Sequence, residues 1–265
     1  MTSSVEEKVA DFYSNKGWQE EDGLTEDARL WEDCRGAAAE YVSKCRLRVL
    51  RHIPESGENM LDMASGPIQY PEYLDFSRNF KKRYCVDLSQ QALEGAKKKI
   101  GEHGVYLHGS FFDINLEENF FDCSISLHTI YHMHKDSQEE AVKKLLFVTK
   151  PGKPVIIVYS NPDVLVNLSW LRKIKRLVVK KKANDKEEFF YFSPHSNSWW
   201  SRFADVAEVK ILPWRSFAAN HQKALIPDNF LGRKIFDILY WMEDHFPNFW
   251  VRHFQYQMIV LKKSD

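Results

Sequence analysis

Residues 59–66 read Asn-Met-Leu-Asp-Met-Ala-Ser-Gly, and residues 84–87 read Tyr-Cys-Val-Asp. The first stretch is an apolar run that passes Asp62 and turns at Gly66, and the second is an apolar run that ends in Asp87. Two strands of this kind, joined by a turn and a helix, form the βαβ unit that presents a nucleoside site at the carboxyl ends of its strands. The two stretches therefore predict a parallel α/β sheet with such a site.

The composition of the turn favours one class of nucleoside cofactor. A dinucleotide needs several glycines whose backbone N–H groups close around its pyrophosphate, but this turn contains only Gly66, and Pro67 has no N–H group. S-adenosylmethionine (SAM) carries no phosphate and requires only one close backbone approach. The turn therefore favours SAM, with Asp87 accepting hydrogen bonds from the ribose hydroxyls. A turn with a purely structural role is the alternative.

Composition limits the classes of protein to which the chain can belong. Its 265 residues, of which 44% are hydrophobic, can bury one large α/β core. Lys plus Arg and Asp plus Glu each number 37, so there is no basic field that would attract nucleic acid. The four cysteines lack CxxC spacing, which favours a reducing cytoplasm. The polar N-terminus and the lack of a long apolar run predict neither a signal peptide nor a membrane span.

Hydrophobic spacing predicts alternating strands and helices along the rest of the chain. Helices are expected over 5–15 and 25–52, after Pro71, from Ser89 to 100, from Ser137 to about 150, and over 229–245; strands are expected over 59–63, 83–87, 105–108, 121–127, 154–159, 206–212 and 255–262. Between the fifth and sixth strands, residues 161–203 read as an irregular insertion with a basic stretch, 172–182, and an aromatic stretch from 189.

The ordered set of motifs resembles the class I SAM-dependent methyltransferases. The set comprises Leu-Asp-x-Ala-Ser-Gly at 61–66, Val-Asp-Leu-Ser at 86–89, Gly-Ser at 109–110, Phe-Asp at 121–122, Leu-His-Thr-Ile-Tyr-His at 127–132 and Lys-Pro-Gly at 150–152. The resemblance implies a Rossmann-like, doubly wound seven-stranded α/β sheet whose last strand is antiparallel. It implies an N-terminal helical lid at 1–56, a SAM-binding core at 57–160, an acceptor-side insertion at 161–204, and the last two strands at 205–265 with a helical insertion at 213–254.

The resemblance also implies which residues bind the cofactor. Asp62, Ala64 and Gly66 would line the methionine end, and Leu127 would offer its carbonyl to the ammonium group. Asp87 would hold the ribose, and the adenine would meet Leu88, Ser110 and Phe111, with Tyr13 in the lid above. At position 110 the family commonly has an acid that holds the adenine amino group. Here Ser110, or the nearby Asp113, is expected to do so.

Histidines after the fourth strand are the candidates for a general base, because an unperturbed histidine titrates near neutral pH. His132 is the first choice and His128 the second, and the alternative is that either caps the strand or touches the cofactor. The spacing of the pair could place two metal ligands on one helical face. Because no third ligand is evident, no metal is expected.

Aromatic and basic side chains in the lid and insertions are the candidates for acceptor binding, namely Trp18, Tyr131, His195, Trp199, Trp200 and Arg215, with Trp214 beside them. Together with the reduced cysteines and the candidate histidine base, they predict a cytoplasmic enzyme that methylates a small molecule, at a hydroxyl of a glycan-related or specialised metabolite. A membrane-surface methyltransferase docked through 228–254 and a non-catalytic SAM-binding regulator are the alternatives. Peripheral membrane contact and a homodimer stay open.

The segment from 227 to 254 has an apolar stripe at helical spacing, formed by Phe230, Leu231, Ile235, Ile238, Leu239 and Met242. This stripe is expected to pack over the acceptor pocket in the first place, against a second subunit in the second, and against a membrane in the third.

Overall fold

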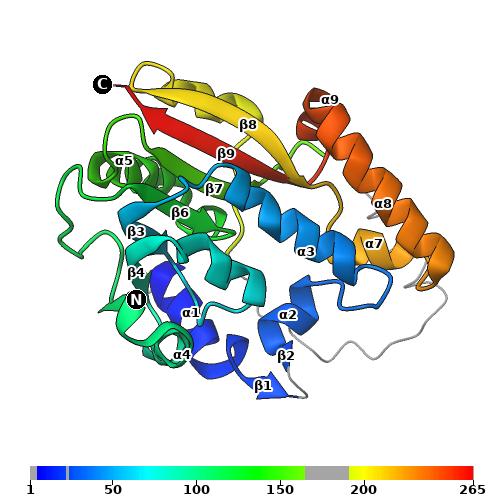
Figure 1. Ribbon diagram of the computed structural model, residues 1–265, viewed down its shortest axis with the longest axis horizontal. Helices are drawn as coiled ribbons and strands as arrows, with labels where there is room; N and C mark the ends of the chain where they lie inside the picture. The colour runs from blue at the N-terminus through cyan, green and yellow to red at the C-terminus, as the bar shows by residue number, and fades with distance from the viewer. Residues whose placement is uncertain (1–4, 22–23, 165–190, 265) are drawn as a thin grey trace.

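The computed structural model describes residues 5–21, 24–164 and 191–264, and a seven-stranded sheet forms its centre (Figure 1). The strands are β3 (Gly57–Met63), β4 (Phe80–Asp87), β5 (Gly104–His108), β6 (Cys123–Leu127), β7 (Pro154–Ser160), β8 (Ala207–Arg215) and β9 (Tyr256–Lys263), in the spatial order β5-β4-β3-β6-β7-β9-β8. Strands β3 to β7 are parallel, and β9 runs antiparallel to both neighbours. The predicted Rossmann-like sheet with an antiparallel last strand is confirmed.

The helices begin with α1 (Val5–Phe12) and a π-helical turn (Tyr13–Gly17), followed by the short strands β1 (Glu20–Glu21) and β2 (Leu24–Thr25). The others are α2 (Glu26–Trp31), α3 (Ala39–Leu47), α4 (Gln90–Ile100), α5 (Gln138–Val148), α7 (Ala219–Leu225), α8 (Phe230–His245) and α9 (Pro247–His253), and short 3-10 helices cover Arg48–Arg51, Pro71–Ser77 and Asn197–Phe203. The Ser89 hydroxyl caps α4 as predicted, whereas Ser137 makes no side-chain cap at α5.

The single helix predicted over 25–52 is wrong, because α2 ends at Trp31 and α3 begins at Ala39. Between them, the Asp33 carboxylate accepts hydrogen bonds from both the backbone N–H and the guanidinium of Arg35. A side chain that bonds to nearby backbone competes with the helical ladder, so this turn ends the helix. Most of the predicted basic and aromatic stretches of the insertion lie outside the described residues.

The two faces of the sheet are covered by different helices. Helix α5 and the 3-10 helix Asn197–Phe203 pack on one face, around buried Leu145, Tyr159 and Trp200. The opposite face packs around Met60, Phe76 and Trp214. Helices α3 and α8 lie side by side next to this face, and the N-terminal helices gather at the lower edge of the molecule (Figure 1).

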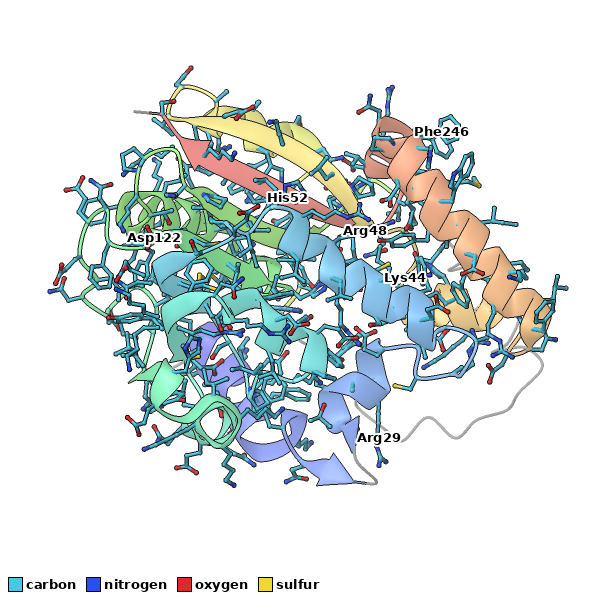
Figure 2. The ribbon with its side chains drawn as sticks, viewed as in Figure 1. Arg29, Lys44, Arg48, His52, Asp122 and Phe246 are labelled. Atoms are coloured by element: carbon cyan, nitrogen blue, oxygen red, sulfur yellow. The ribbon has the colours of Figure 1, made fainter. Side chains whose placement is uncertain are left out.

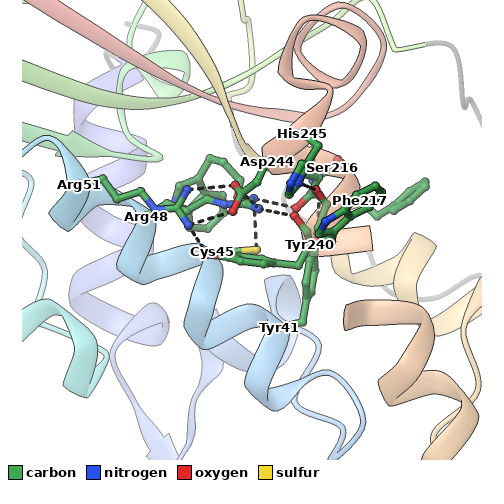
Figure 3. Close-up of polar contacts among 12 residues, drawn as sticks. Tyr41, Cys45, Arg48, Arg51, Ser216, Phe217, Tyr240, Asp244 and His245 are labelled. Carbon is green, nitrogen blue, oxygen red and sulfur yellow. Dashed lines mark hydrogen bonds and ion pairs between the residues drawn. The ribbon is translucent and has the colours of Figure 1, made fainter. Parts of the chain in front are cut away.

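A buried polar network holds α8 against α3, as Figure 3 shows. The Glu243 carboxylate accepts hydrogen bonds from the Arg48 guanidinium at 2.7 Å, the Tyr41 hydroxyl at 2.7 Å and the backbone N–H of Ser216 at 2.9 Å. Arg48 also donates to the carbonyl of Trp214 at 2.8 Å. The network thereby fixes the backbone on both sides of residue 215 at the end of β8.

The predicted apolar stripe of α8 is divided between two environments. Leu239 is buried against α3, and Ile235 and Met242 pack against the same cluster. Phe230, Leu231 and Ile238 are more than half exposed. That the stripe covers the acceptor stays a prediction. At the end of α8, Phe246 points away from the sheet (Figure 2).

Candidate active site

The turn after β3 is built from unusual backbone conformations. Ala64, Gly66 and Ile68 have φ of +58°, +55° and +51°, which place all three in the left-handed region. Ala64 and Ser65 both donate backbone N–H bonds to the carbonyl of Val86 on β4. An alanine and a β-branched residue adopt this region only at a cost, and such strain concentrates at binding sites. Ala64 therefore takes a glycine-like conformation without being glycine.

Asp87 lies beside this turn, at the carboxyl end of β4. Its carboxylate accepts hydrogen bonds from the backbone N–H of Gly66 at 2.9 Å and of Ser89 at 2.8 Å. Burial raises its pKa to about 6, and the two backbone bonds counteract part of that rise. Because a carboxylate has about four acceptor sites, Asp87 retains capacity for further donors such as ribose hydroxyls.

Asp62 has a different partner from the one that the resemblance implied. Its carboxylate forms a buried ion pair with Arg83 of β4, in which Nε lies 3.0 Å from Oδ2 and Nη2 is also bonded to that oxygen. Arg83 donates in addition to the carbonyl of Tyr73. The ion pair links the end of β3, directly before the turn, to β4. We therefore regard Asp62 as a residue that positions the turn, and its contact with the methionine end stays a prediction.

The N-terminal segment covers the turn. A Cβ atom placed on Gly66 would lie 2.9 Å from the Trp18 ring, so the indole rests directly on this glycine. Tyr13 stacks on Trp18 with 4.8 Å between ring centroids, and its hydroxyl donates to Asp27 Oδ1 at 3.3 Å. Burial, together with Asp27 and Asp87, raises the Tyr13 pKa well above its ordinary value. The structure thus brings the predicted residues Tyr13 and Trp18 to the predicted cofactor site.

The ends of β5 and β6 complete this edge of the sheet. After β5, the Ser110 hydroxyl donates to Glu6 of α1 at 2.9 Å, while Phe111 is buried in the core beside it. After β6, the carbonyl of Leu127 accepts a bond from the Thr129 hydroxyl at 3.1 Å. Leu88 is partly exposed next to Asp87. Asp113 is exposed and close to Lys144, so its predicted role toward the adenine has no support.

His128 follows β6 directly and has φ of +59°, which is uncommon for histidine. Its Nδ1 lies 3.0 Å from the Tyr131 hydroxyl, and its ring contacts Trp214 and Tyr256 at 4.5 and 5.1 Å between centroids. Nε2 is buried and has no hydrogen-bond partner among the described residues. Burial and then the nearby Arg215 lower the His128 pKa well below its ordinary value, so the ring is neutral at neutral pH.

His132 occupies a different environment. Its Nδ1 lies 2.8 Å from the carbonyl of Tyr191, and its ring packs against Tyr131 and Phe192. Burial lowers its pKa to about 4. The Nδ1 contact ties His132 to the segment after the insertion, whereas His128 faces Arg215. We therefore take His128 forward as the candidate base ahead of His132, and the role of each stays a prediction.

Charged side chains next to His128 form a buried cluster. Arg215, with 2% of its surface exposed, donates to Glu32 at 2.6 Å, and its guanidinium lies 4.9 Å from the Trp214 ring centre. Arg46 lies 3.5 Å from the same Glu32 carboxylate. Nε of Arg46 and of Arg215 has no partner among the described residues. The cluster thus combines hydrogen-bond donors, acceptors and aromatic rings, which is the chemistry that a polar ligand requires.

Three predicted acceptor contacts lie elsewhere. Trp199 and Trp200 are 7% and 0% exposed and belong to the core on the α5 face. His195 stacks on Trp199 at 4.3 Å, with its Nε2 near the carbonyl of Lys135. His195 is partly exposed. Tyr131 is buried in the same cluster as the two tryptophans, but its hydroxyl reaches His128. The predicted acceptor contacts of all these residues stay predictions.

The residues present at this edge fit SAM. The left-handed turn at Gly66, the Asp87 carboxylate, the Ser110 and Glu6 pair and the Leu127 carbonyl all lie at the carboxyl ends of neighbouring parallel strands. Glu6, Asp27, Glu32, Arg46 and Tyr256 were missed by the sequence reasoning. The acidic first turn of α1 was visible in the sequence, but its partner in space was not.

Comparisons with known proteins agree with this geometry. Residues 61–157 match the family model described as a methyltransferase domain, and no curated protein sequence matches significantly. Among solved structures, the chain is similar to geranyl diphosphate C-methyltransferase from Streptomyces coelicolor A3(2), with 15% identity, a TM-score of 0.57 and coverage of 99% of this chain and 98% of that one. It is also similar to the N-methyltransferase NodS from Bradyrhizobium japonicum WM9, with 10% identity, a TM-score of 0.57 and coverage of 99% and 100%. The complex of DhpI with S-adenosylhomocysteine (SAH) gives 11% identity, a TM-score of 0.58 and coverage of 100% and 99%.

Residues 61–157 thus match a methyltransferase domain, and the order of the strands is that of the Rossmann-like fold of the class I SAM-dependent methyltransferases. At these identities the structural neighbours establish the fold and leave the acceptor open. Within the described residues, no helix is long and apolar enough to cross a membrane. Those residues also contain no group of three or more side chains suited to hold a metal ion.

Proposed function

We propose that this methyltransferase acts on a hydroxyl group of a small polar molecule, such as a sugar or a specialised metabolite. The observation that carries the proposal is His128, whose buried Nε2 lacks a partner in the described residues. The same side chain contacts Trp214 and Tyr256 beside the buried Arg215. A neutral imidazole in this position can accept the proton of a hydroxyl nucleophile.

The geometry supports a division of roles. SAM supplies an activated methyl group on a sulfonium, so the protein needs chiefly to position the nucleophile and to remove its proton. With His128 Nδ1–H donating to the Tyr131 oxygen, Nε2 is free to accept that proton. Burial keeps Tyr131 protonated by raising its pKa. Arg215 and Glu32 orient the other polar groups of the acceptor.

Turnover to SAH tests the proposal. The protein is incubated with SAM and panels of sugars, phenols, amines and carboxylates, and SAH is quantified by mass spectrometry. We expect acceptor-dependent SAH only with hydroxyl compounds, and methyl-ether products. Binding of SAH without turnover on any panel would instead indicate a non-catalytic regulator, and methylated amines would contradict the hydroxyl assignment.

A membrane-surface enzyme is the second candidate, because α8, α9 and the residue between them expose large apolar side chains. Phe230, Leu231, Ile238, Trp241, Phe246 and Phe249 are each more than half exposed. Such a surface is typical of proteins that bind a partner or a bilayer. Co-sedimentation with anionic liposomes that is lost in Trp241→Ser/Phe246→Ser would favour a lipid or lipid-linked acceptor.

A further inference from the structure

The position that commonly carries an acid for the adenine is Ser110 in this chain, and the structure supplies a carboxylate from another element. The Ser110 hydroxyl donates to Glu6 Oε1 at 2.9 Å and accepts from the backbone N–H of Phe112 at 3.3 Å. The only hydroxyl hydrogen of Ser110 is thereby used. Glu6 Oε1 has a second lone pair, and Oε2 has no hydrogen bond within the described residues. The carboxylate therefore retains acceptor capacity at the end of β5.

The N-terminal segment follows the whole cofactor edge. Glu6 meets Ser110 after β5, Tyr13 lies near Asp87 after β4, and Trp18 rests on Gly66 after β3. The segment from Glu6 to Trp18 therefore passes the ends of β5, β4 and β3 in turn, which lie about 4.8 Å apart from one strand to the next. This order places α1 and the π-helical turn after it along the site, from its adenine end toward its methionine end.

We propose that Glu6, on the lid helix α1, is the residue that recognises the adenine amino group. This inference rests on the proposed binding of SAM. The 6-amino group of adenine only donates hydrogen bonds, and the Glu6 carboxylate only accepts them. A hypoxanthine base would present an oxo group to the same carboxylate, and two acceptors repel. Adenine selectivity therefore comes from the lid, and α1 must be in place for the base to be read.

Isothermal titration with SAH and with S-inosyl-L-homocysteine, which carries hypoxanthine, tests the proposal. The native protein should prefer SAH by about 30-fold or more, and Glu6→Ala should reduce this preference to less than about five-fold. Ser110→Asp in the Glu6→Ala background should restore the preference, because it returns an acid to the strand end. Glu7→Ala, which removes the same charge from the same helix, should leave the preference unchanged.

An unchanged preference in Glu6→Ala would overturn the proposal, as would an equal loss in Glu7→Ala, which would indicate a general effect of charge or helix stability. Circular dichroism confirms that each variant is folded. If the native protein binds neither SAH nor S-inosyl-L-homocysteine, the proposed methyltransferase function is itself overturned. If it binds SAH without discriminating between the bases, only the role of Glu6 fails.

Discussion

Arg48 and Glu243 are 195 positions apart in the sequence and form a fully buried ion pair, with Nη1 2.7 Å from Oε2. Removing one partner of such a pair is strongly destabilising, and Arg48 would keep only its second ion pair, with Asp244 at 3.0 Å. Glu243→Ala should therefore lower the free energy of unfolding by about 3–5 kcal/mol, measured by urea denaturation. Glu243 also accepts from Tyr41 and Ser216, so these donors lose their partner as well.

The matched control is Glu40→Ala, which removes an exposed i,i+4 partner of Lys44 on α3. Its urea midpoint should stay close to that of the native protein, because exposed pairs contribute little. A Glu243→Ala variant as stable as Glu40→Ala would show that the network does not fasten α8 to α3.

Asp87→Ala should weaken SAH binding at least about 30-fold, because two ribose hydroxyls would lose a charged acceptor in a buried site, at a cost of about 2–4 kcal/mol. Calorimetry measures the affinity, with Asp113→Ala as an exposed control. NAD should not compete with SAH. Equal affinity of the native and Asp87→Ala proteins would remove Asp87 from the cofactor site.

The affinity for SAH should depend on pH through Asp87, whose pKa is raised to about 6. Ribose hydroxyls bind the ionised carboxylate, so binding competes with protonation. The affinity should be constant above about pH 7 and fall toward tenfold per unit as the pH drops below 6. Asp87→Asn should bind weakly at every pH and show no such fall.

Asp27 also has a pKa raised to about 6, mainly by burial, and it lies under Tyr13. It provides the control for the pH experiment. Asp27→Asn should keep the pH dependence of SAH binding, since it leaves Asp87 intact. If the pH dependence disappears in Asp27→Asn and persists in Asp87→Asn, the titrating carboxylate is Asp27 and not Asp87.

The two histidines should separate in kinetic assays. His128→Ala should lower kcat by about 10² or more with nearly unchanged SAH affinity, as expected for loss of a general base. His132→Ala should lower kcat much less, because His132 Nδ1 contacts the carbonyl of Tyr191. The reverse order would restore His132 as the base, and a loss of SAH affinity in His128→Ala would move His128 to the cofactor site.

The sheet and the cofactor edge could be predicted because their signals are local. An apolar run that ends at Asp87 and a turn at Gly66 each lie within a few residues, and parallel strands bring their carboxyl ends together. The Glu6–Ser110 and Arg215–Glu32 contacts join distant segments, and neither spacing nor periodicity encodes such pairings. The division of the α8 stripe between buried Leu239 and exposed Ile238 depends on where α3 packs, which periodicity does not encode either.

The position of β9 has a consequence for how the chain folds. This strand lies between β7 and β8 and is the only partner of β8 among the described strands. Until residues 256–263 leave the ribosome, β8 has nothing to pair with, and the apolar β7 presents an open edge. Pairings over such separations are slow to form, and unpaired edges invite aggregation. The second half of the sheet must therefore assemble late, on a first half that is already formed around β3 and β4.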